Sequence, residues 1–209
     1  MAIVSIRGTS GSGKSTVVRE VMKKYNCEPI NAPWRRRPLG YLCYADEHKP
    51  LFIPGHYETD CGGCDTLPAI EFTFNLIRRY INECDVIYEG LITQSDVNRC
   101  IQLHKDGYSV LVIGLNLPLA KCLKYVQQRR DARAEAHGRE TSPLNPSNTN
   151  AKHHQITLQE AKFKSAKMDF RWLCREDALR ATLEFLGWKN QPDSFDLSSL
   201  PEAKDDGSH

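Results

Sequence analysis

The chain has 209 residues, a length that suits one sizeable domain with at most a small insertion. Its composition, 40% hydrophobic and 26% charged, is ordinary for a globular protein, and its apolar runs are far shorter than the roughly 20 residues that a membrane-spanning helix needs. The formal net charge is only +2, so charge alone does not require a nucleic-acid partner, and we expect no membrane association.

The amino terminus and the cysteines bear on where the chain works. Met1 leads directly into an apolar segment, so no signal or transit peptide fits. The eight cysteines follow no repeating spacing, and we expect reduced thiols in a cytoplasm rather than a disulfide framework. Cys61 and Cys64 form a C-x-x-C pattern, but no second pair of ligands stands at zinc-binding spacing. We therefore interpret the glycines between them as a place where a substrate approaches the backbone closely.

The strongest motif follows the first apolar segment. Residues 2–6 predict a short buried strand, residues 8–15 match G-x-x-x-x-G-K-[ST], and residues 17–25 form an amphipathic helical pattern. In this context the pattern predicts a phosphate-binding loop whose N–H groups point at a polyphosphate, aided by the positive end of the helix. We predict that Lys14 reaches the β- and γ-phosphates and that Ser15 binds Mg²⁺. The residues expected to bind the nucleotide are Gly8, Thr9, Ser10, Gly11, Ser12, Gly13, Lys14, Ser15 and Thr16.

Strand-like and helix-like segments alternate along the rest of the chain, which predicts an α/β fold with a mostly parallel sheet flanked by helices. Strands are expected at residues 41–44, 51–53, 85–90 and 108–117, and helices at residues 66–80, 93–105, 118–136, 157–169 and 173–185. Irregular structure is expected at residues 26–40 and 141–150, and a disordered tail at residues 190–209. We expect a single domain over residues 1–189, with a helical lid at about residues 118–156.

Acidic residues near the carboxyl ends of the strands are candidate site residues, because ligands bind at that edge of a parallel sheet. Glu89 ends a short apolar strand and is expected to hold Mg²⁺ directly or through water, whereas Asp85, at the other end, is expected to face solvent. Asp60 and Asp65 lie in a glycine-rich stretch at residues 55–65, and either could accept the proton of an attacking hydroxyl. Asp65 could equally cap the helix that follows.

Two arginine clusters suit phosphate groups. Arg129, Arg130 and Arg133 lie on one expected helix, where residues 129 and 133 share a face. Guanidinium groups match the charge that spreads over a transferring phosphate, so we predict a catalytic role rather than a solvated helix face. At residues 34–37 a tryptophan precedes three arginines; this segment could stack on a base and hold its phosphates, or it could be a surface loop.

These motifs resemble a known family. The phosphate loop, the strand end Tyr88-Glu89-Gly90, and Leu117-Pro118 followed by Arg129-Arg130-x-x-Arg133 are similar to P-loop kinases of the nucleotide and nucleoside kinase group. The resemblance implies a P-loop NTPase-type fold, ATP with Mg²⁺, and an arginine helix that belongs to a mobile lid. Residues 55–66 further resemble bacteriophage P-loop kinases that phosphorylate 5-hydroxymethyluracil within DNA during thymine hypermodification. We see no clear parallel strand after the lid.

The predicted function is therefore transfer of the γ-phosphate of ATP to a hydroxyl of a nucleic-acid acceptor. The specific expectation is the 5-hydroxymethyl group of 5-hydroxymethyluracil in DNA, in the host cytoplasm if the chain is viral. The alternatives are a kinase of free nucleosides, nucleoside monophosphates or polynucleotide 5′-hydroxyls and, from another class, an NTP-hydrolysing switch or binding module. No N-K-x-D guanine-reading motif appears, which argues against a GTPase switch. The sequence does not define the oligomeric state.

Overall fold

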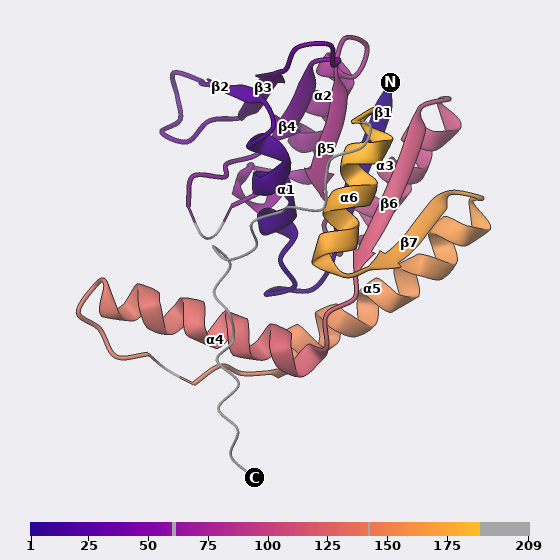
Figure 1. Ribbon diagram of the computed structural model, residues 1–209. Coiled ribbons are helices and arrows are strands. Elements are labelled where there is room, and N and C mark those ends of the chain that lie inside the picture. Colours follow the sequence, from indigo (N-terminus) through magenta and orange to yellow (C-terminus); the bar gives the residue numbers. More distant parts are fainter. Residues whose placement is uncertain (60–61, 142, 189–209) are drawn as a thin grey trace.

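A computed structural model describes residues 1–59, 62–141 and 143–188. In this part of the chain a seven-stranded sheet has the order β2-β3-β4-β5-β1-β6-β7 and carries helices on both faces (Figure 1). The strands are β1 (Ala2–Arg7), β2 (Asn26–Ile30), β3 (Gly40–Tyr44), β4 (Leu51–Pro54), β5 (Asp85–Glu89), β6 (Ser109–Leu115) and β7 (Asp169–Leu173). The helices are α1 (Lys14–Met22), α2 (Ile70–Tyr80), α3 (Gln94–Lys105), α4 (Leu119–Glu135), α5 (Ser147–Ser165) and α6 (Arg175–Phe185), with a 3₁₀ helix, η1, at Cys64–Thr66. The expected tail at residues 190–209 lies outside the described residues.

The sheet is mostly parallel, as predicted. β4, β5, β1, β6 and β7 run in one direction, and only β3 is antiparallel to its two neighbours. Consecutive residues of β1 point to opposite faces of the sheet. Ile3 joins the apolar cluster that contains Phe74 of α2, whereas Val4 joins the cluster that contains Val18 of α1 and Leu179 of α6. β1 is therefore buried on both faces, and the loop that follows it starts from a fixed point.

Two strands were not predicted, and both lie at the edges of the sheet. β2 falls within residues 26–40, which the prolines suggested were irregular. Pro29 is tolerated because an edge strand can turn a residue without an N–H away from its partner. β7 follows the lid and pairs in parallel with β6, so the expectation that no further strand follows the lid is wrong. Neither strand has the continuous apolar run of a central strand: the exposure patterns of β2 and β7 are mixed.

The helix boundaries agree with the sequence in the middle of the chain and differ at two places. α3 and α4 match the helices expected at residues 93–105 and 118–136. Asp65 does not cap α2, because it lies in η1 and the chain is extended at Leu67 before α2 begins. The segment expected to be irregular at residues 141–150 includes the first turn of α5.

Asp85 was expected to face solvent and is instead buried. One of its carboxylate oxygens accepts a hydrogen bond of 2.7 Å from the backbone N–H of Ala2, at the start of β1. Since β5 and β1 are neighbours, this carboxylate satisfies a backbone donor at the end of the sheet remote from the phosphate loop. Its role is structural, and it takes no part in the site.

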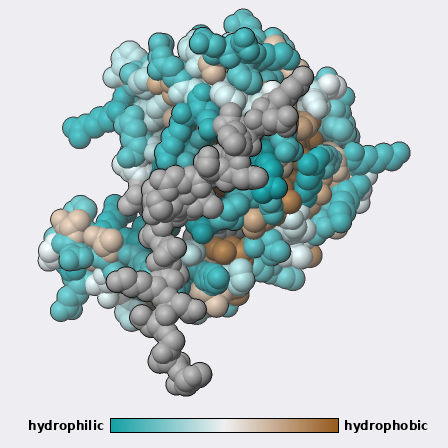
Figure 2. Space-filling model, in the orientation of Figure 1, coloured by the Kyte–Doolittle hydropathy of each residue, from teal (hydrophilic) through white to brown (hydrophobic). Residues whose placement is uncertain are grey.

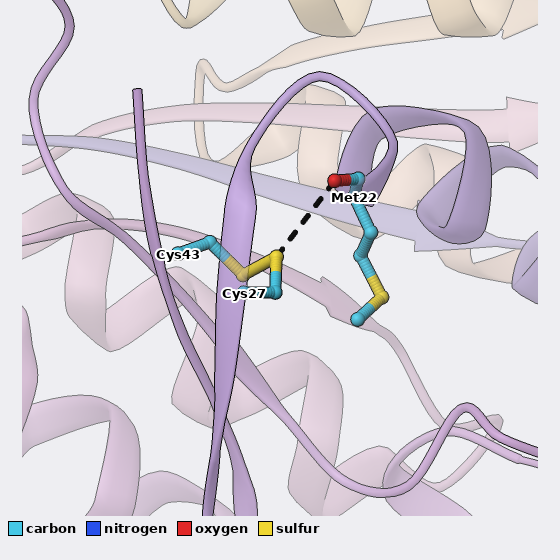
Figure 3. Close-up of a disulfide and its surroundings, with 3 residues drawn as sticks. All are labelled: Met22, Cys27 and Cys43. Atoms are coloured by element: carbon cyan, nitrogen blue, oxygen red, sulfur yellow. Dashed lines mark hydrogen bonds between the residues drawn. A yellow bond between two sulfur atoms is a disulfide. The ribbon is translucent and has the colours of Figure 1, made fainter. Parts of the chain in front are cut away.

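Cys27 of β2 and Cys43 of β3 form a disulfide (Figure 3), so the expectation that all thiols are reduced is wrong for this pair. The two residues are directly opposite each other in the antiparallel register, a relation that could not be seen without β2. The Sγ atom of Cys27 also lies 3.8 Å from the carbonyl oxygen of Met22, at the end of α1. The five free cysteines in the described part of the chain are Cys64, Cys84, Cys100, Cys122 and Cys174.

The surface is largely hydrophilic on the face drawn in Figure 2, with small separate apolar patches. Among the described residues, no helix combines the length and the apolar character that crossing a membrane requires. The large apolar side chains that stand exposed there are Met1, Trp34, Tyr44 and Leu158. Trp34 is the largest of these and the most exposed, at 63%.

Candidate active site

The predicted phosphate loop joins the end of β1 to the start of α1. Gly11 and Gly13 have φ angles of 82° and 98°, which L side chains rarely adopt. A Cβ atom at Gly11 would lie 2.4 Å from the carbonyl oxygen of Cys122 on α4, and one at Gly13 would lie 2.5 Å from the Cδ atom of Arg175 on α6. The loop therefore needs glycine at both positions, and it is enclosed by the first turns of α4 and α6.

Lys14 turns back over this loop. Its Nζ atom donates a hydrogen bond of 3.0 Å to the carbonyl oxygen of Gly8 and one of 3.5 Å to that of Thr9. α1 begins at Lys14, so the unpaired N–H groups of its first turn lie at the loop. The ammonium group and the helix terminus together make this loop a positively charged cradle for a polyphosphate.

Glu89 lies beside the loop, because β5 pairs with β1 and residue 89 is opposite Ile6. Its side chain is 5% exposed, and its Oε1 atom has no hydrogen-bond partner among the described residues. Burial raises the pKa of this carboxyl group, and the positive charge of Lys14 and the hydroxyl of Ser15 partly oppose that rise. A buried carboxylate oxygen without a partner, next to a hydroxyl, offers the oxygen ligands that Mg²⁺ requires, so these residues fit the metal.

The glycine-rich stretch at residues 55–66 folds directly over Glu89. His56 and Gly63 form an isolated antiparallel bridge, in which the Gly63 N–H donates to the His56 carbonyl oxygen at 2.7 Å. A Cβ atom at Gly63 would lie 2.6 Å from the Oε1 atom of Glu89. Gly63 of this stretch and the end of β5 beside the phosphate loop thus meet at this carboxylate.

Arg19 of α1 contacts Tyr57 and Thr59, in the first half of this stretch. Its guanidinium group donates to the carbonyl oxygens of Tyr57 at 3.0 Å and Thr59 at 2.6 Å. α1, which begins at the phosphate loop, therefore also holds the backbone of residues 57 and 59. Arg19 was not predicted as a site residue, and only its position one and a half turns into α1 could have indicated it.

Two buried polar groups on neighbouring residues of this stretch lack partners in the part of the chain that the structure describes. These are the Nδ1 atom of His56 and the hydroxyl of Tyr57, on side chains that are each 4% exposed. Burial raises the pKa of Tyr57 well above its usual value, and the nearby charge of Glu89 raises it further. Burial lowers the pKa of His56, which Glu58 partly opposes. Unpaired buried polar atoms are rare, so these two atoms are candidates to bind a polar substrate group.

Of the two candidate bases, one lies near Glu89 and the other lies outside the described residues. Asp65 is exposed on η1, and its charge contributes to the raised pKa of Glu89, so it lies within electrostatic range of the site. Asp60 lies outside the described residues. The choice between these two aspartates as proton acceptor stays a prediction.

The arginines of α4 follow the part of the helix that touches the phosphate loop. Cys122 and Val126 contact the loop at Gly11, and Arg129, Arg130 and Arg133 occupy the later turns. None of these three arginines forms an ion pair with another described residue. α4 projects to one side of the sheet in Figure 1. Their catalytic role is not tested by this arrangement.

Arg7, the last residue of β1, belongs to a buried network that the sequence did not reveal. Its side chain is ion-paired with Asp96 at the start of α3, and both are 1% exposed. It also donates hydrogen bonds of 3.0 Å to the carbonyl oxygen of Leu91 and to the Oε1 atom of Gln159 on α5. Its guanidinium carbon lies 4.7 Å from the centre of the Phe163 ring. An arginine at the end of an apolar strand was the only signal, because its partners are 84 to 152 residues away.

A phosphate loop between a buried strand and a helix, with a buried acidic strand end beside it, defines a P-loop kinase. The chain is 40% identical to a 5-hmdU DNA kinase from Pseudomonas phage PaMx11 over 186 residues, which cover 88% of this chain and 96% of the relative. The chain belongs to this family of 5-hmdU DNA kinases, and it is a phosphotransferase. The predictions of the family and of the kinase class are confirmed.

Two further relatives and one solved structure are also similar to the chain. A 5-hmdU DNA kinase from Pseudomonas phage M6 is 23% identical over 201 residues, covering 90% of this chain and all of the relative. One from Delftia phage PhiW-14 is 39% identical over 65 residues, which cover 31% of this chain and 22% of the relative. The solved structure of deoxyadenosine kinase from M. mycoides with bound dATP aligns with 88% of this chain and 98% of that chain, at 14% identity and a TM-score of 0.45. No family model matches the chain.

Proposed function

We propose that the chain transfers the γ-phosphate of ATP to the 5-hydroxymethyl group of 5-hydroxymethyluracil in DNA, in the cytoplasm of a phage-infected host. One observation carries this proposal: the buried carboxylate of Glu89, whose Oε1 atom has no hydrogen-bond partner among the described residues, lies between the phosphate loop and Gly63. A phosphate donor and a hydroxyl acceptor can meet there. The names of the relatives support DNA containing 5-hmdU as the acceptor.

On the donor side, the loop N–H groups and Lys14 bind the β- and γ-phosphates. They stabilise the negative charge that develops on the β-phosphate as its bond to the γ-phosphorus breaks and ADP leaves. Ser15 and Glu89 hold Mg²⁺, which when bound supplies positive charge at the phosphate oxygens. Glu89 must be ionised for this role; burial raises the pKa of its carboxyl group, and the positive charge of Lys14 opposes that rise.

On the acceptor side, the base enters against residues 55–66, and its hydroxyl points at the phosphate beside Glu89. Asp65 or Asp60 accepts the hydroxyl proton as the new bond to phosphorus forms. Arg129, Arg130 and Arg133 contact the equatorial oxygens when the lid closes. A base in a duplex is hidden, so the substrate base must leave the stack before transfer.

The acceptor is tested with γ-labelled ATP and three substrates: DNA that contains 5-hydroxymethyluracil, matched DNA with thymine and free 5′-hydroxyls, and free nucleosides with their monophosphates. We expect label only in the first. Label confined to the free small molecules, or appearing at plain 5′ ends, would select one of the alternative kinases. Phosphate release with no labelled acceptor would favour an NTP-hydrolysing module. Lys14→Ala should abolish transfer with an unchanged circular dichroism spectrum, because Lys14 contacts only loop carbonyls.

The base is tested by Asp65→Asn and Asp60→Asn in single-turnover assays. Asp65→Asn should slow the chemical step about 10²–10⁴-fold while ATP affinity changes little, which is the usual effect of losing a general base. If only Asp60→Asn slows that step, Asp60 is the base. If neither does, no aspartate in this stretch accepts the proton.

A further inference from the structure

A second loop lies beside the acceptor stretch at the same edge of the sheet. β2 runs parallel to β4, so residues 31–39, which join β2 to β3, emerge at the carboxyl edge together with residues 55–66. The Gly55 N–H donates a hydrogen bond of 2.8 Å to the carbonyl oxygen of Leu39. The two segments are therefore joined where the acceptor stretch begins.

A chain of hydrogen bonds also ties residues 31–39 to the part of the acceptor stretch that covers Glu89. Arg35 donates to the carbonyl oxygens of Arg37, at 2.8 Å, and Thr66, at 2.6 Å. The Thr66 hydroxyl in turn donates to the Gly63 carbonyl oxygen at 2.7 Å and accepts from the His56 N–H at 3.1 Å. Arg35 is thus used inside the protein, and the loop has a defined position relative to the site.

Trp34 is held in place and yet exposed. Its ring meets the ring of Phe72 on α2 edge to face, with centroids 6.1 Å apart and an interplanar angle of 86°. The side chain nevertheless stays 63% exposed, although an indole buries favourably. An aromatic ring that is fixed on one edge and open on its faces can stack on a nucleobase.

Two cations follow this tryptophan in the same loop and form no ion pair within the described protein. Arg36 and Arg37 are exposed and form no ion pair with any described residue. After burial and Glu58, the charges of Arg37 and Arg35 are the next influences on the pKa of the buried His56, and they lower it, so the loop contributes a positive field at His56. A surface loop that contacts only solvent has no need of an exposed tryptophan together with two arginines that form no ion pair.

We propose that Trp34, Arg36 and Arg37 bind the DNA on either side of the acceptor base, a platform that rests on the proposed function. The indole stacks on the base next to the acceptor base, and the two guanidinium groups contact the flanking phosphates. Stacking compensates for the contact that the neighbouring base loses when the acceptor base leaves the duplex. The loop thereby couples recognition of the strand to the site through Thr66 and Gly63.

The platform is tested by fluorescence anisotropy with a labelled duplex that contains a single 5-hydroxymethyluracil, for the full chain and three variants. Trp34→Ala should weaken DNA binding about 10-fold or more, as losing one stacked base does, without changing the salt dependence. Arg36→Ala/Arg37→Ala should reduce the slope of log K against log salt by about 1.8, because two phosphate contacts are lost. The control Lys49→Ala/Lys105→Ala removes two exposed cations at the opposite edge of the sheet and should change neither quantity. ATP affinity should be the same in all four proteins.

Tryptophan fluorescence gives a second measurement that does not depend on affinity alone. DNA should quench the emission of the wild-type chain, and Trp34→Phe, which keeps a ring against Phe72, should abolish that quenching while Trp172 and Trp188 still emit. Quenching that persists in Trp34→Phe, or variants that bind like the wild type while the wild type phosphorylates DNA, would overturn the platform and leave the proposed function intact. A wild-type chain that phosphorylates only free nucleosides would overturn the proposed function instead.

Discussion

Glu89 shows how one residue can carry two opposed requirements. Its carboxyl group is buried, which favours the neutral form, whereas its proposed role requires the ionised form. The positive charge of Lys14 lies close enough to moderate the effect of burial. Nucleotide phosphates add negative charge at the same place, so the metal and the phosphates are expected to bind together rather than separately.

The titration of Glu89 gives a prediction with a defined sign. Its folded-state pKa lies above the value of the unfolded chain, so its contribution to stability is complete below the unfolded pKa and is lost as pH rises through the folded pKa. Glu89→Gln should therefore gain stability relative to the wild type as pH rises from 4 to 7 (denaturant unfolding), while kcat falls about 10²-fold or more. A stability difference that does not vary with pH would show that Glu89 does not titrate in this range.

Gly63 offers a matched comparison of two glycines. Gly63 has φ 88° and ψ −164°, a region open essentially to glycine alone, and its added Cβ would overlap the Glu89 carboxylate. Gly63→Ala should cost about 3 kcal/mol of unfolding free energy and most of the activity. Gly107→Ala, at φ 92° with no atom within 4 Å of its Cβ, should cost about 1 kcal/mol and leave activity unchanged. Equal effects of the two substitutions would contradict the contact with Glu89.

At the scale of elements, the sequence predicted the strands and helices that have a clear pattern and missed those that do not. β1, β5 and β6 are apolar runs because both of their faces are covered. Thr93 and Pro118 mark the starts of α3 and α4. β2 and β7 are edge strands of mixed exposure, where pairing with one neighbour replaces an apolar pattern as the cause of the strand.

The candidate site divides in the same way. The phosphate loop, Glu89 and residues 55–65 were predictable because their spacing and strand-end positions are local properties of the sequence. Arg7 and Arg19 were not, because their functions depend on partners that only the folded chain brings near. His56 and Tyr57 lay inside a stretch that the sequence singled out, but their burial without partners is a property of packing.

The β2–β3 disulfide leads to a prediction at this scale. Cys27 and Cys43 are 16 residues apart, and closing a loop of that length is worth about 3 kcal/mol in a chain-entropy estimate. Dithiothreitol should lower the unfolding free energy of the wild type by about this amount, and it should have no effect on Cys27→Ala/Cys43→Ala. An unfolding curve of the wild type that is the same with and without reductant would show that the pair is not linked in solution.

For the whole molecule, the Arg7 network joins parts that are far apart in the chain. Arg7 connects β1 to Asp96 of α3 and to Gln159 of α5, and the Gln159 amide donates to the Ile92 carbonyl oxygen at 2.8 Å. α5 is thus fixed to β1, the strand that leads into the phosphate loop. The Thr9 hydroxyl also donates to the Thr149 carbonyl oxygen near the start of α5, at 3.3 Å.

Removing one member of this buried pair should be far worse than removing both. Arg7→Met leaves the Asp96 carboxylate buried without its charged partner, with only the Leu91 N–H among the described residues donating to it, and should cost about 3–5 kcal/mol of unfolding free energy, whereas Arg7→Met/Asp96→Leu should recover most of that loss. The comparison is Arg78→Ala, which breaks a surface ion pair with Asp106 and should cost at most about 1 kcal/mol. Chemical denaturation of the four proteins measures this, and a double variant less stable than Arg7→Met would contradict it.

The order of the strands has a consequence for how such kinases can diverge. Residues 26–66 carry β2, β3, β4 and the described parts of both loops that we propose face the acceptor, as one continuous piece of chain that the phosphate loop precedes and α4 follows. Recombination between related genes at its two ends would exchange the whole acceptor surface together and leave the nucleotide-binding half intact. Preference for a new base could therefore spread among phage kinases as a cassette, without the slow accumulation of compensating substitutions around the phosphate loop.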